Sequence, residues 1–400
     1  MFPKLQTSPY LTCILPNEPI PIVYMTDTKE PTYPEQDKAE NAAFGVIGLD
    51  RETVWHPEIR ALKALEFAAK RPIAEHELIQ MFGAGLISDL RHRGWLQYPE
   101  NLCREYWLRT GQIEITSHCN WRCNYCPVSQ DPKPQATMSL SLFEEIVEKL
   151  SKVPTIKFVT FHFYNEATLD KFFKDRIYIL AKYGMKLSLA SNGSGLTEDK
   201  ICLLKDTGVL HHLLINMPTL DGDKFRNFTG SSSSYKFSIK NVDLAISMGL
   251  PMTIAVNGTQ EELSTNLPAL KEKYEPLGAE VRPFLTCDRA GSLKGKYNQG
   301  VAVKGRLRGC SWPLNHAHFS INGDMFICCN DYYQREIFGN IKDGSIAEIM
   351  ESQAAIVLRR KVFGVDMAEE DFVCRSCHDQ SLDFKHRQFR PPASFPILKD

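Results

Sequence analysis

Three cysteines lie within eight residues in the segment TSHCNWRCNYCPVSQ, residues 116–130. Cys119 and Cys123 are separated by three residues, and Cys123 and Cys126 by two. Structural zinc takes four ligands, whereas a [4Fe–4S] cluster takes one thiolate for each iron. Three cysteines would therefore leave one iron with an open coordination position, which is typical of a catalytic metal. The pattern favours a reactive iron–sulfur cluster, and a zinc site completed by His118 is the alternative.

The other cysteines are unevenly placed along the chain. The sequence has 12 cysteines in 400 residues, and further groups occur at 310–329 and 374–377. In a reducing compartment, grouped cysteines are metal ligands more often than disulfides. The isolated residues, which we expect to be small buried hydrophobic side chains, are Cys13, Cys103, Cys202 and Cys287.

Composition and charge narrow the class of protein. The net charge of −1 gives no electrostatic case for binding nucleic acid or an acidic membrane surface. No run of residues reaches the length of about 18 apolar residues that a membrane-spanning helix needs. The N-terminal sequence lacks the basic and apolar regions of a secretory signal. We therefore expect a cytoplasmic protein with neither a nucleic acid nor a membrane as partner.

Residues 1–104 form the first of three expected domains. After a proline-rich opening, three segments have helical patterns, and the last is followed by a short strand-like run. These segments are HPEIRALKALEFAAKR (56–71), AEHELIQMF (74–82), GLISDLRHRG (85–94) and WLQY (95–98). Three helices and a strand in this order predict a small winged-helix-like domain.

Residues 105–305 alternate strand and helix patterns. The expected strands are residues 112–116, 156–163, 186–191, 211–216, 251–256 and 279–285. Strands alternating with helices predict an α/β fold with a parallel sheet. Six strands are too few for a closed eight-stranded barrel, but a partial barrel would still place its site at the carboxyl ends of the strands. The three-cysteine segment follows the first strand on that face.

Residues 306–400 form the third expected domain. HFSINGDMFICC (318–329) predicts a hairpin with its turn at Asn322 to Asp324, and SIAEIMESQAAIVLRR (345–360) predicts a helix. A unit this small needs a staple, which its cysteines could supply through a metal cluster.

The segment CNWRCNYC resembles the cluster loop of the radical S-adenosylmethionine (radical SAM) enzymes, including the aromatic residue before the last cysteine. The family implies a partial (β/α)6 TIM-like barrel, in which S-adenosylmethionine binds the open iron of a [4Fe–4S] cluster through its amino and carboxylate groups. It also implies one-electron cleavage to a 5′-deoxyadenosyl radical that abstracts hydrogen from a substrate. The family further implies a reducing partner, such as a flavodoxin or ferredoxin, that supplies the electron. The cofactors carry the chemistry, while the barrel orients them.

Several positions can be carried over from the family one at a time. Its Gly-Gly-Glu-like stretch corresponds to FYNEATLD (163–170), where Glu166 keeps the carboxylate and Tyr164 and Asn165 replace the glycines. The cofactor's ammonium group needs that carboxylate as its partner. Polar side chains at the ends of the third and fourth strands would meet the ribose or carboxylate, and the aromatic residue of the cysteine loop would pack by the adenine. These further candidates are Ser191, Asn192, Asn216 and Tyr125.

The later cysteines resemble the auxiliary-cluster extension called SPASM or, in its shorter form, Twitch. DRAG (288–291) and GNIKDGSIAEIM (339–350) also resemble that extension. Because no cysteine follows Cys377, the resemblance implies a single auxiliary [4Fe–4S] cluster. Its expected ligands are Cys310, Cys328, Cys374 and Cys377. Zinc in the same four thiolates is the alternative, and Cys329 is a lesser candidate for a stand-in ligand or a hydrogen donor.

The sequence specifies the substrate less well than the fold or the cofactors. Radical SAM enzymes with such extensions often modify ribosomally made (RiPP) peptides, and those maturases commonly carry an N-terminal winged-helix element that grips the peptide leader as an added strand. We therefore expect a precursor peptide as substrate. A dehydrogenase or epimerase acting on a small molecule, such as a sugar or aminocyclitol, is the alternative. A non-catalytic metal protein that binds DNA is a third reading.

Overall fold

A nine-stranded sheet organises most of the described chain. The computed structural model describes residues 3–14, 45–47, 54–55 and 58–378. The strand order is β12-β11-β10-β9-β8-β7-β13-β14-β15, and β7 to β12 are parallel neighbours. These six strands are β7 (Thr110–Ile113), β8 (Phe158–Thr160), β9 (Lys186–Ser191), β10 (Leu210–Asn216), β11 (Met252–Gly258) and β12 (Glu280–Leu285). The predicted α/β fold with a parallel six-stranded part is confirmed.

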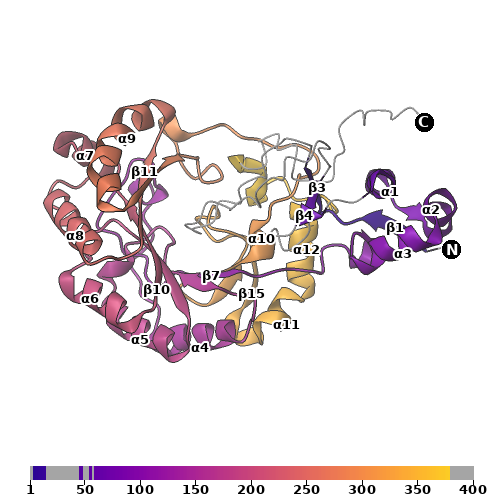
Figure 1. Cartoon of the computed structure of the whole chain (residues 1–400), viewed down its shortest axis with the longest axis horizontal. Coiled ribbons are helices and arrows are strands. Elements are labelled where there is room, and N and C mark those ends of the chain that lie inside the picture. The colour runs from indigo at the N-terminus through magenta and orange to yellow at the C-terminus, as the bar shows by residue number, and fades with distance from the viewer. Residues whose placement is uncertain (1–2, 15–44, 48–53, 56–57, 379–400) are drawn as a thin grey trace.

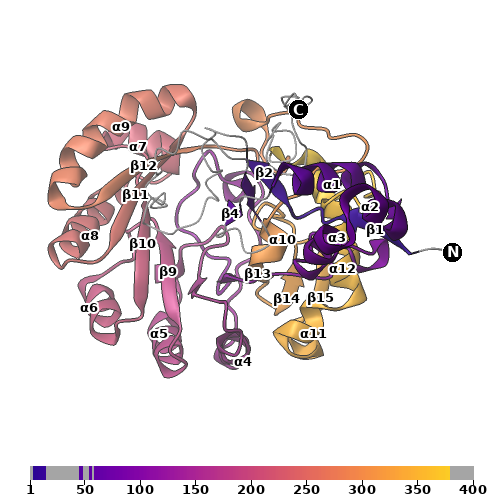
Figure 2. The same cartoon turned by 45° about the vertical axis from the view of Figure 1, so that its right-hand side comes forward.

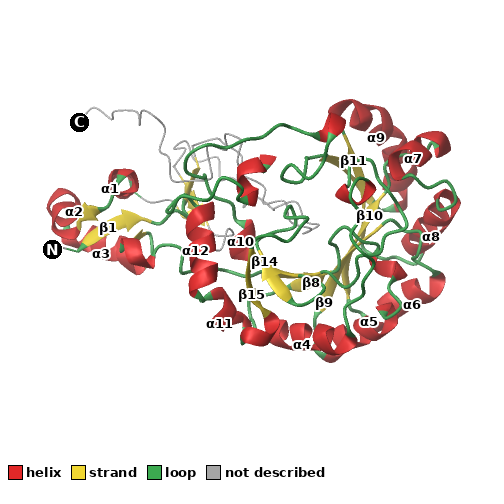
Figure 3. Ribbon diagram, turned by 180° about the vertical axis from the view of Figure 1, so that it is seen from behind, coloured by secondary structure: helices red, strands yellow, loops and turns green. Residues whose placement is uncertain are grey.

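Helices cover the outer face of the parallel strands. They are α4 (Leu140–Ser151), α5 (Phe173–Lys182), α6 (Glu198–Thr207), α7 (Gly222–Thr229), α8 (Tyr235–Ser247) and α9 (Gln260–Tyr274). Figure 3 shows this outer ring around a curved inner sheet. The ends of the sheet are β12 and β15, so the barrel is open. Expected strand 156–163 is shorter in the structure because the chain leaves the sheet after Thr160.

The C-terminal part extends the barrel's own sheet. The predicted hairpin consists of β13 (His316–Phe319) and β14 (Asp324–Phe326), and β15 (Ile337–Asn340) follows it. β13 pairs in parallel with β7. The helix expected over 345–360 is two helices, α11 (Ile346–Met350) and α12 (Gln353–Val362), with α10 (Trp312–Asn315) before the hairpin. The break occurs because the Ser352 hydroxyl accepts a hydrogen bond from Ala355 N at 3.2 Å and caps a new helix.

An N-terminal unit has a separate core beside this end of the molecule. Its sheet has the order β5-β1-β6, and helices α1 (Ile59–Lys70), α2 (Glu75–Phe82) and α3 (Ala84–His92) pack on it. Its strands are β1 (Lys4–Thr7), β5 (Ile73–Ala74) and β6 (Leu96–Gln97). A further small sheet contains β2 (Thr12–Ile14), β3 (Gly45–Ile47) and β4 (Val54–Trp55). Figures 1 and 2 show α1 to α3 near α12 and far from α8.

Three hydrophobic cores underlie these parts. The largest fills the space between the barrel strands and helices and includes Phe319 and Met325 of the hairpin. The second lies within the N-terminal unit. The third combines Tyr10 and Leu102 with residues 290–377, including Cys374 and Cys377. The winged-helix reading and the domain boundaries remain predictions. None of the helices in the described segments is long and apolar enough to cross a membrane.

The isolated cysteines match their expected burial only in part. Cys103 is buried in the third core, whereas Cys202 and Cys287 are partly exposed. The side chain of Cys13 lies outside the described residues.

One buried ion pair fixes the segment that leaves β8. Arg176 Nε donates to Asp170 Oδ2 at 2.6 Å, and both side chains are fully buried. A second guanidinium nitrogen of Arg176 donates to the carbonyl of Met138 at 2.5 Å. The pair therefore ties the loop after β8 to the segment that precedes α4.

We predict that Arg176→Met lowers the free energy of unfolding by about 3–5 kcal/mol, because Asp170 would be left as an unpaired buried charge. The double variant Asp170→Asn, Arg176→Met should recover part of that loss. Urea unfolding of the metal-free protein, followed by circular dichroism, measures both. A single variant as stable as the parent protein would contradict the prediction.

Candidate functional site

Three thiols share one loop at the carboxyl end of β7. Cys123 is 8% exposed, while Cys119 and Cys126 are partly exposed. Cys126 N donates to the carbonyl of Cys123 at 2.9 Å, so the last two cysteines lie in one tight turn. Burial, and then the nearby thiol groups of Cys126 and Cys119, raise the pKa of Cys123 well above its usual value. The structure therefore brings the three predicted residues together.

The thiols of this loop have no positive group that compensates their burial fully. Burial, followed by the charge of Glu166, raises the pKa of Cys119 to about 12. Bound metal stabilises thiolates strongly enough to reverse such a shift. Three neighbouring sulfur donors on one loop, of which Cys123 is buried, thus fit an iron–sulfur cluster, whose irons would be held by Cys119, Cys123 and Cys126.

A buried tryptophan anchors the cysteine loop to the helices after β10. Trp121 is 1% exposed, its Nε1 donates to Ser234 Oγ at 2.8 Å, and its ring meets Phe225 edge-on at 5.0 Å. The backbone joins in as well, because Arg122 N donates to the carbonyl of Thr229 at 2.7 Å. Helix α7, which carries Phe225, therefore supports the cluster loop directly.

Glu166 is a buried carboxylate beside that loop. It is 1% exposed, and Glu166 N donates to the carbonyl of His118 at 2.8 Å. Its Oε1 accepts from Ser191 Oγ at 2.7 Å and from the backbone and hydroxyl of Thr168, while Oε2 accepts from Asn192 N at 2.6 Å. Burial raises the pKa of this carboxyl group. Since a carboxylate oxygen can accept two bonds, Oε2 keeps capacity for an ammonium donor.

The strand ends bring the other predicted polar residues to the same edge. Ser191 ends β9 and Asn216 ends β10, and the two strands run parallel with Ser191 opposite Ile215. Tyr125 Oη donates to Asn216 Oδ1 at 3.1 Å. Tyr125 also meets Tyr297 edge-on at 6.5 Å. The candidates of the sequence thus form two adjoining groups, one around Glu166 and one around Asn216.

Two asparagines in these groups were not anticipated. Asn257 Nδ2 donates to Asn216 Oδ1 at 3.0 Å, and Asn120 Oδ1 accepts from Asn192 Nδ2 at 2.9 Å. Asn257 lies near the carboxyl end of β11. A polar residue at the end of a predicted strand was a signal from which this site residue could have been found. Asn120 lies between the first two cysteines, and its position there gave no such signal.

The four later cysteines gather in the third core. Cys374 and Cys377 are 7% and 8% exposed, and Cys310 and Cys328 pack against the same core. Burial raises the pKa of Cys328, and the thiol groups of Cys329, Cys374, Cys377 and Cys310 raise it further. This mutual influence places all four predicted ligands within electrostatic reach of one another. The set fits a cluster held by four thiolates.

Cys287 and Cys329 both lie within electrostatic reach of Arg289, as does Cys126 of the first group. The charges that raise the pKa of the Arg289 guanidinium include those of Cys287, Cys329 and Cys126. No group of three Cys, His, Asp or Glu side chains within the described residues is arranged to hold a single metal ion.

Family models match both regions. A model of the radical SAM superfamily matches residues 113–264, and a model of the SPASM iron–sulfur cluster-binding domain matches residues 310–378. The chain belongs to the radical SAM superfamily. It is an iron–sulfur enzyme of that superfamily with a SPASM domain. The radical SAM domain binds a [4Fe–4S] cluster together with S-adenosylmethionine. The SPASM domain binds auxiliary iron–sulfur clusters.

Curated relatives of this radical SAM protein act on different substrate classes. The S-adenosyl-L-methionine-dependent 2-deoxy-scyllo-inosamine dehydrogenase of Niallia circulans is 23% identical over 274 residues, which are 68% of this chain and 93% of that protein. The putative peptide biosynthesis protein YydG of Bacillus subtilis is 27% identical over 178 residues, 42% of this chain and 54% of YydG. The sequence likeness therefore leaves the substrate class open.

Solved structures share the fold. SuiB of Streptococcus suis, bound to its precursor peptide SuiA, aligns with a TM-score of 0.55 at 11% identity and covers 93% of each chain. The enzyme anSMEcpe with bound AdoMet aligns with a TM-score of 0.51 at 16% identity, over 68% of this chain and 83% of that one. At these identities the likeness concerns the fold alone.

We predict that Glu166→Gln weakens S-adenosylmethionine binding by about 10- to 100-fold, because a hydrogen bond to a charged group contributes about 1.5–3 kcal/mol. Equilibrium dialysis with the reconstituted protein measures the affinity. The matched control is Glu145→Gln on α4, whose carboxylate pairs with Lys149 at 2.9 Å on the surface. Unchanged affinity in Glu166→Gln, with normal iron content, would rule out this role for the carboxylate.

Proposed function

We propose that the chain modifies a ribosomally synthesised peptide by radical chemistry, through a crosslink, an epimerisation or a related change. Cys119, Cys123 and Cys126 hold the cluster whose open iron binds S-adenosylmethionine. Once reduced by a partner such as a flavodoxin or ferredoxin, this cluster would supply one-electron cleavage of S-adenosylmethionine to methionine and a 5′-deoxyadenosyl radical, and so hydrogen abstraction from the peptide.

The remaining site residues position the cofactor. Glu166 Oε2 accepts a hydrogen bond from the amino group of S-adenosylmethionine. Ser191 and Asn192 hold the ribose or the carboxylate of the cofactor. Tyr125 packs by the adenine, with Asn216 fixing its hydroxyl. A single auxiliary cluster is ligated by the four cysteines of the third core. Its closed ligand set suits electron transfer or structural support more than substrate binding.

The N-terminal unit is the observation that carries the peptide assignment. It has its own core, and its outer strands β5 and β6 each pair with β1 on one side only within the described sheet. Free strand edges can take up an extended peptide through backbone hydrogen bonds. Helix α2 also exposes Ile79 and Met81, at 37% and 49%, which offers apolar contact area on the same unit. A small-molecule enzyme would need no such unit.

The comparisons support both candidate substrates to different extents. A fold likeness to a peptide-bound enzyme over 93% of this chain includes the region of the N-terminal unit. The aminocyclitol dehydrogenase, by contrast, aligns over nearly its whole length but leaves about a third of this chain unmatched. A small-molecule dehydrogenase is therefore the second candidate.

Iron content tests the cluster assignment. We predict about eight irons per chain after anaerobic reconstitution, as two cubes of four. Replacing Cys119, Cys123 and Cys126 by alanine should leave about four, and so should Cys374→Ala, Cys377→Ala. Iron and zinc analysis with Mössbauer spectroscopy measures this. A protein that holds one zinc and no iron would contradict the assignment.

The substrate class can be tested by assaying the two candidate substrates with the same enzyme. Reduced holoenzyme with S-adenosylmethionine should modify a short peptide encoded beside its gene, which mass spectrometry detects in deuterated water. A leader-only fragment of that peptide should inhibit the reaction, since it would occupy the N-terminal unit without supplying the modified core. Turnover of 2-deoxy-scyllo-inosamine with no peptide modification would favour the second candidate instead.

A further inference from the structure

Tyr164 has a backbone conformation that is costly for a tyrosine. Its φ angle is +55°, in the left-handed region that glycine enters freely and bulky residues rarely occupy. Such strain persists only where surrounding contacts impose it, and it gathers at functional sites. Among the described residues, only five other than glycine have positive φ, and Gln334, on a neighbouring loop, is another of them.

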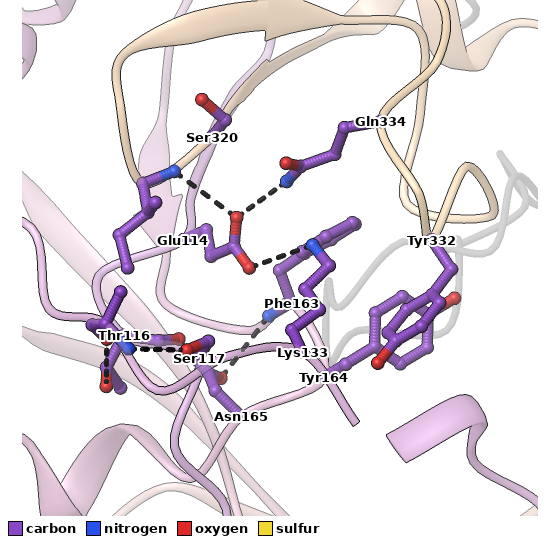
Figure 4. Close-up of polar contacts among 12 residues, drawn as sticks. Glu114, Thr116, Ser117, Lys133, Phe163, Tyr164, Asn165, Ser320, Tyr332 and Gln334 are labelled. Carbon is purple, nitrogen blue, oxygen red and sulfur yellow. Dashed lines mark hydrogen bonds and ion pairs between the residues drawn. The ribbon is translucent and has the colours of Figure 1, made fainter. Parts of the chain in front are cut away.

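The contacts of Tyr164 lead to the loop that follows the auxiliary cysteines. Its Oη donates to the carbonyl of Cys329 at 2.7 Å. Its ring meets Phe163 and Tyr332 edge-on, each at 4.9 Å between centroids. Figure 4 shows the rings of Tyr164 and Tyr332 side by side. One side chain therefore spans the gap between the loop after β8 and residues 328–334.

A second set of contacts joins the same loop to the barrel. Glu114 is 1% exposed and accepts from Gln334 Nε2 at 2.6 Å, from Lys133 Nζ at 3.2 Å and from Ile321 N at 3.3 Å. The Lys133 ammonium also lies 4.5 Å from the centre of the Phe163 ring. In Figure 4, dashed lines join both Lys133 and Gln334 to the carboxylate of Glu114. This network holds the 328–334 loop against the end of β7.

The backbone of Tyr164 leads to Glu166, the carboxylate proposed to bind the cofactor, and through it to the cluster loop. Glu166 is two residues away, and its backbone nitrogen bonds to the carbonyl of His118, the residue before Cys119. Asn165 Nδ2 donates to the carbonyl of Thr116 at 2.9 Å. A shift of Tyr164 would therefore move Glu166 relative to the cysteines of the first cluster.

We propose that Tyr164 is a positioning residue that couples the auxiliary-cluster loop to the S-adenosylmethionine site through its hydrogen bond to Cys329. The acceptor carbonyl belongs to the neighbour of Cys328, so ligation of an auxiliary cluster by Cys328 fixes that carbonyl in place. The bond then holds the strained backbone at Tyr164, and with it Glu166, in the geometry that receives the cofactor. This proposal rests on the ligands assigned above.

The coupling is measured as a difference between affinities. Loss of the auxiliary cluster in the otherwise unchanged variant Cys374→Ala, Cys377→Ala should weaken S-adenosylmethionine binding by about tenfold relative to the reconstituted parent enzyme. This factor is within the range usual for coupled sites. Tyr164→Phe removes only the hydroxyl and should produce a similar loss by itself. In the combined variant the loss should stay near tenfold, because the link is already broken. Equilibrium dialysis gives the affinities.

Two further variants separate coupling from folding. Tyr164→Gly accepts the left-handed backbone without the bond, so it should behave like Tyr164→Phe and remain insensitive to the auxiliary cluster. Tyr178→Phe is the matched control, since Tyr178 is 49% exposed on α5. The electron paramagnetic resonance shift of the reduced first cluster on cofactor addition should weaken in Tyr164→Phe but not in the control.

The outcomes distinguish failure of the coupling from failure of the ligand assignment. If Cys374→Ala, Cys377→Ala retains about eight irons, the assigned ligands are wrong, and the iron count shows this independently of the affinities. If the iron falls to about four but the losses in the combined variant multiply to about a hundredfold, Tyr164 does not couple the sites. Parent-like affinity in Tyr164→Phe overturns the proposal as well.

Discussion

Thiols whose burial is not offset by the arginines near them are the constraint on which this structure depends. Two groups of cysteines lie in places where burial and mutual repulsion oppose thiolate formation. A buried charge is stable only when it is paired or bound to metal. Iron supplies that compensation in a radical SAM enzyme, so the folded chain and its clusters stabilise each other. The surrounding elements, from Trp121 to the third core, hold the thiols where metal can reach them.

The parallel sheet places everything else around the first group of thiols. Because the carboxyl ends of parallel strands meet at one edge, single polar residues from β9, β10 and β11 converge although they are far apart in sequence. The hairpin strand β13 extends the same sheet beyond β7. The SPASM region is thereby built onto the barrel, and the loop with Cys328 and Cys329 comes to face the loop with Tyr164 and Glu166.

The sequence predicted what repeats or clusters, and missed what depends on distant contacts. Strands such as β9 were recognisable from their apolar runs, and the cysteine groups from their spacing. Strand β1 was missed because it has four residues, with Leu5 as the single apolar side chain in the core. Helix α7 is polar along much of its length and is delimited by the Asp221 cap and by Gly230. The left-handed Tyr164 was missed although it replaces a glycine of the family pattern, because its contacts with Cys329 and Tyr332 lie more than 160 residues away in the sequence.

The central claim is that the open iron of the cluster held by Cys119, Cys123 and Cys126 binds S-adenosylmethionine. Electron–nuclear double resonance on the reduced protein with cofactor labelled by ¹⁵N at the amino group tests it directly. We expect a ¹⁵N coupling in the parent enzyme and in Cys374→Ala, Cys377→Ala, which keeps only the first cluster. Absence of the coupling in both, or its survival in the triple alanine variant of the first cluster, would contradict the account.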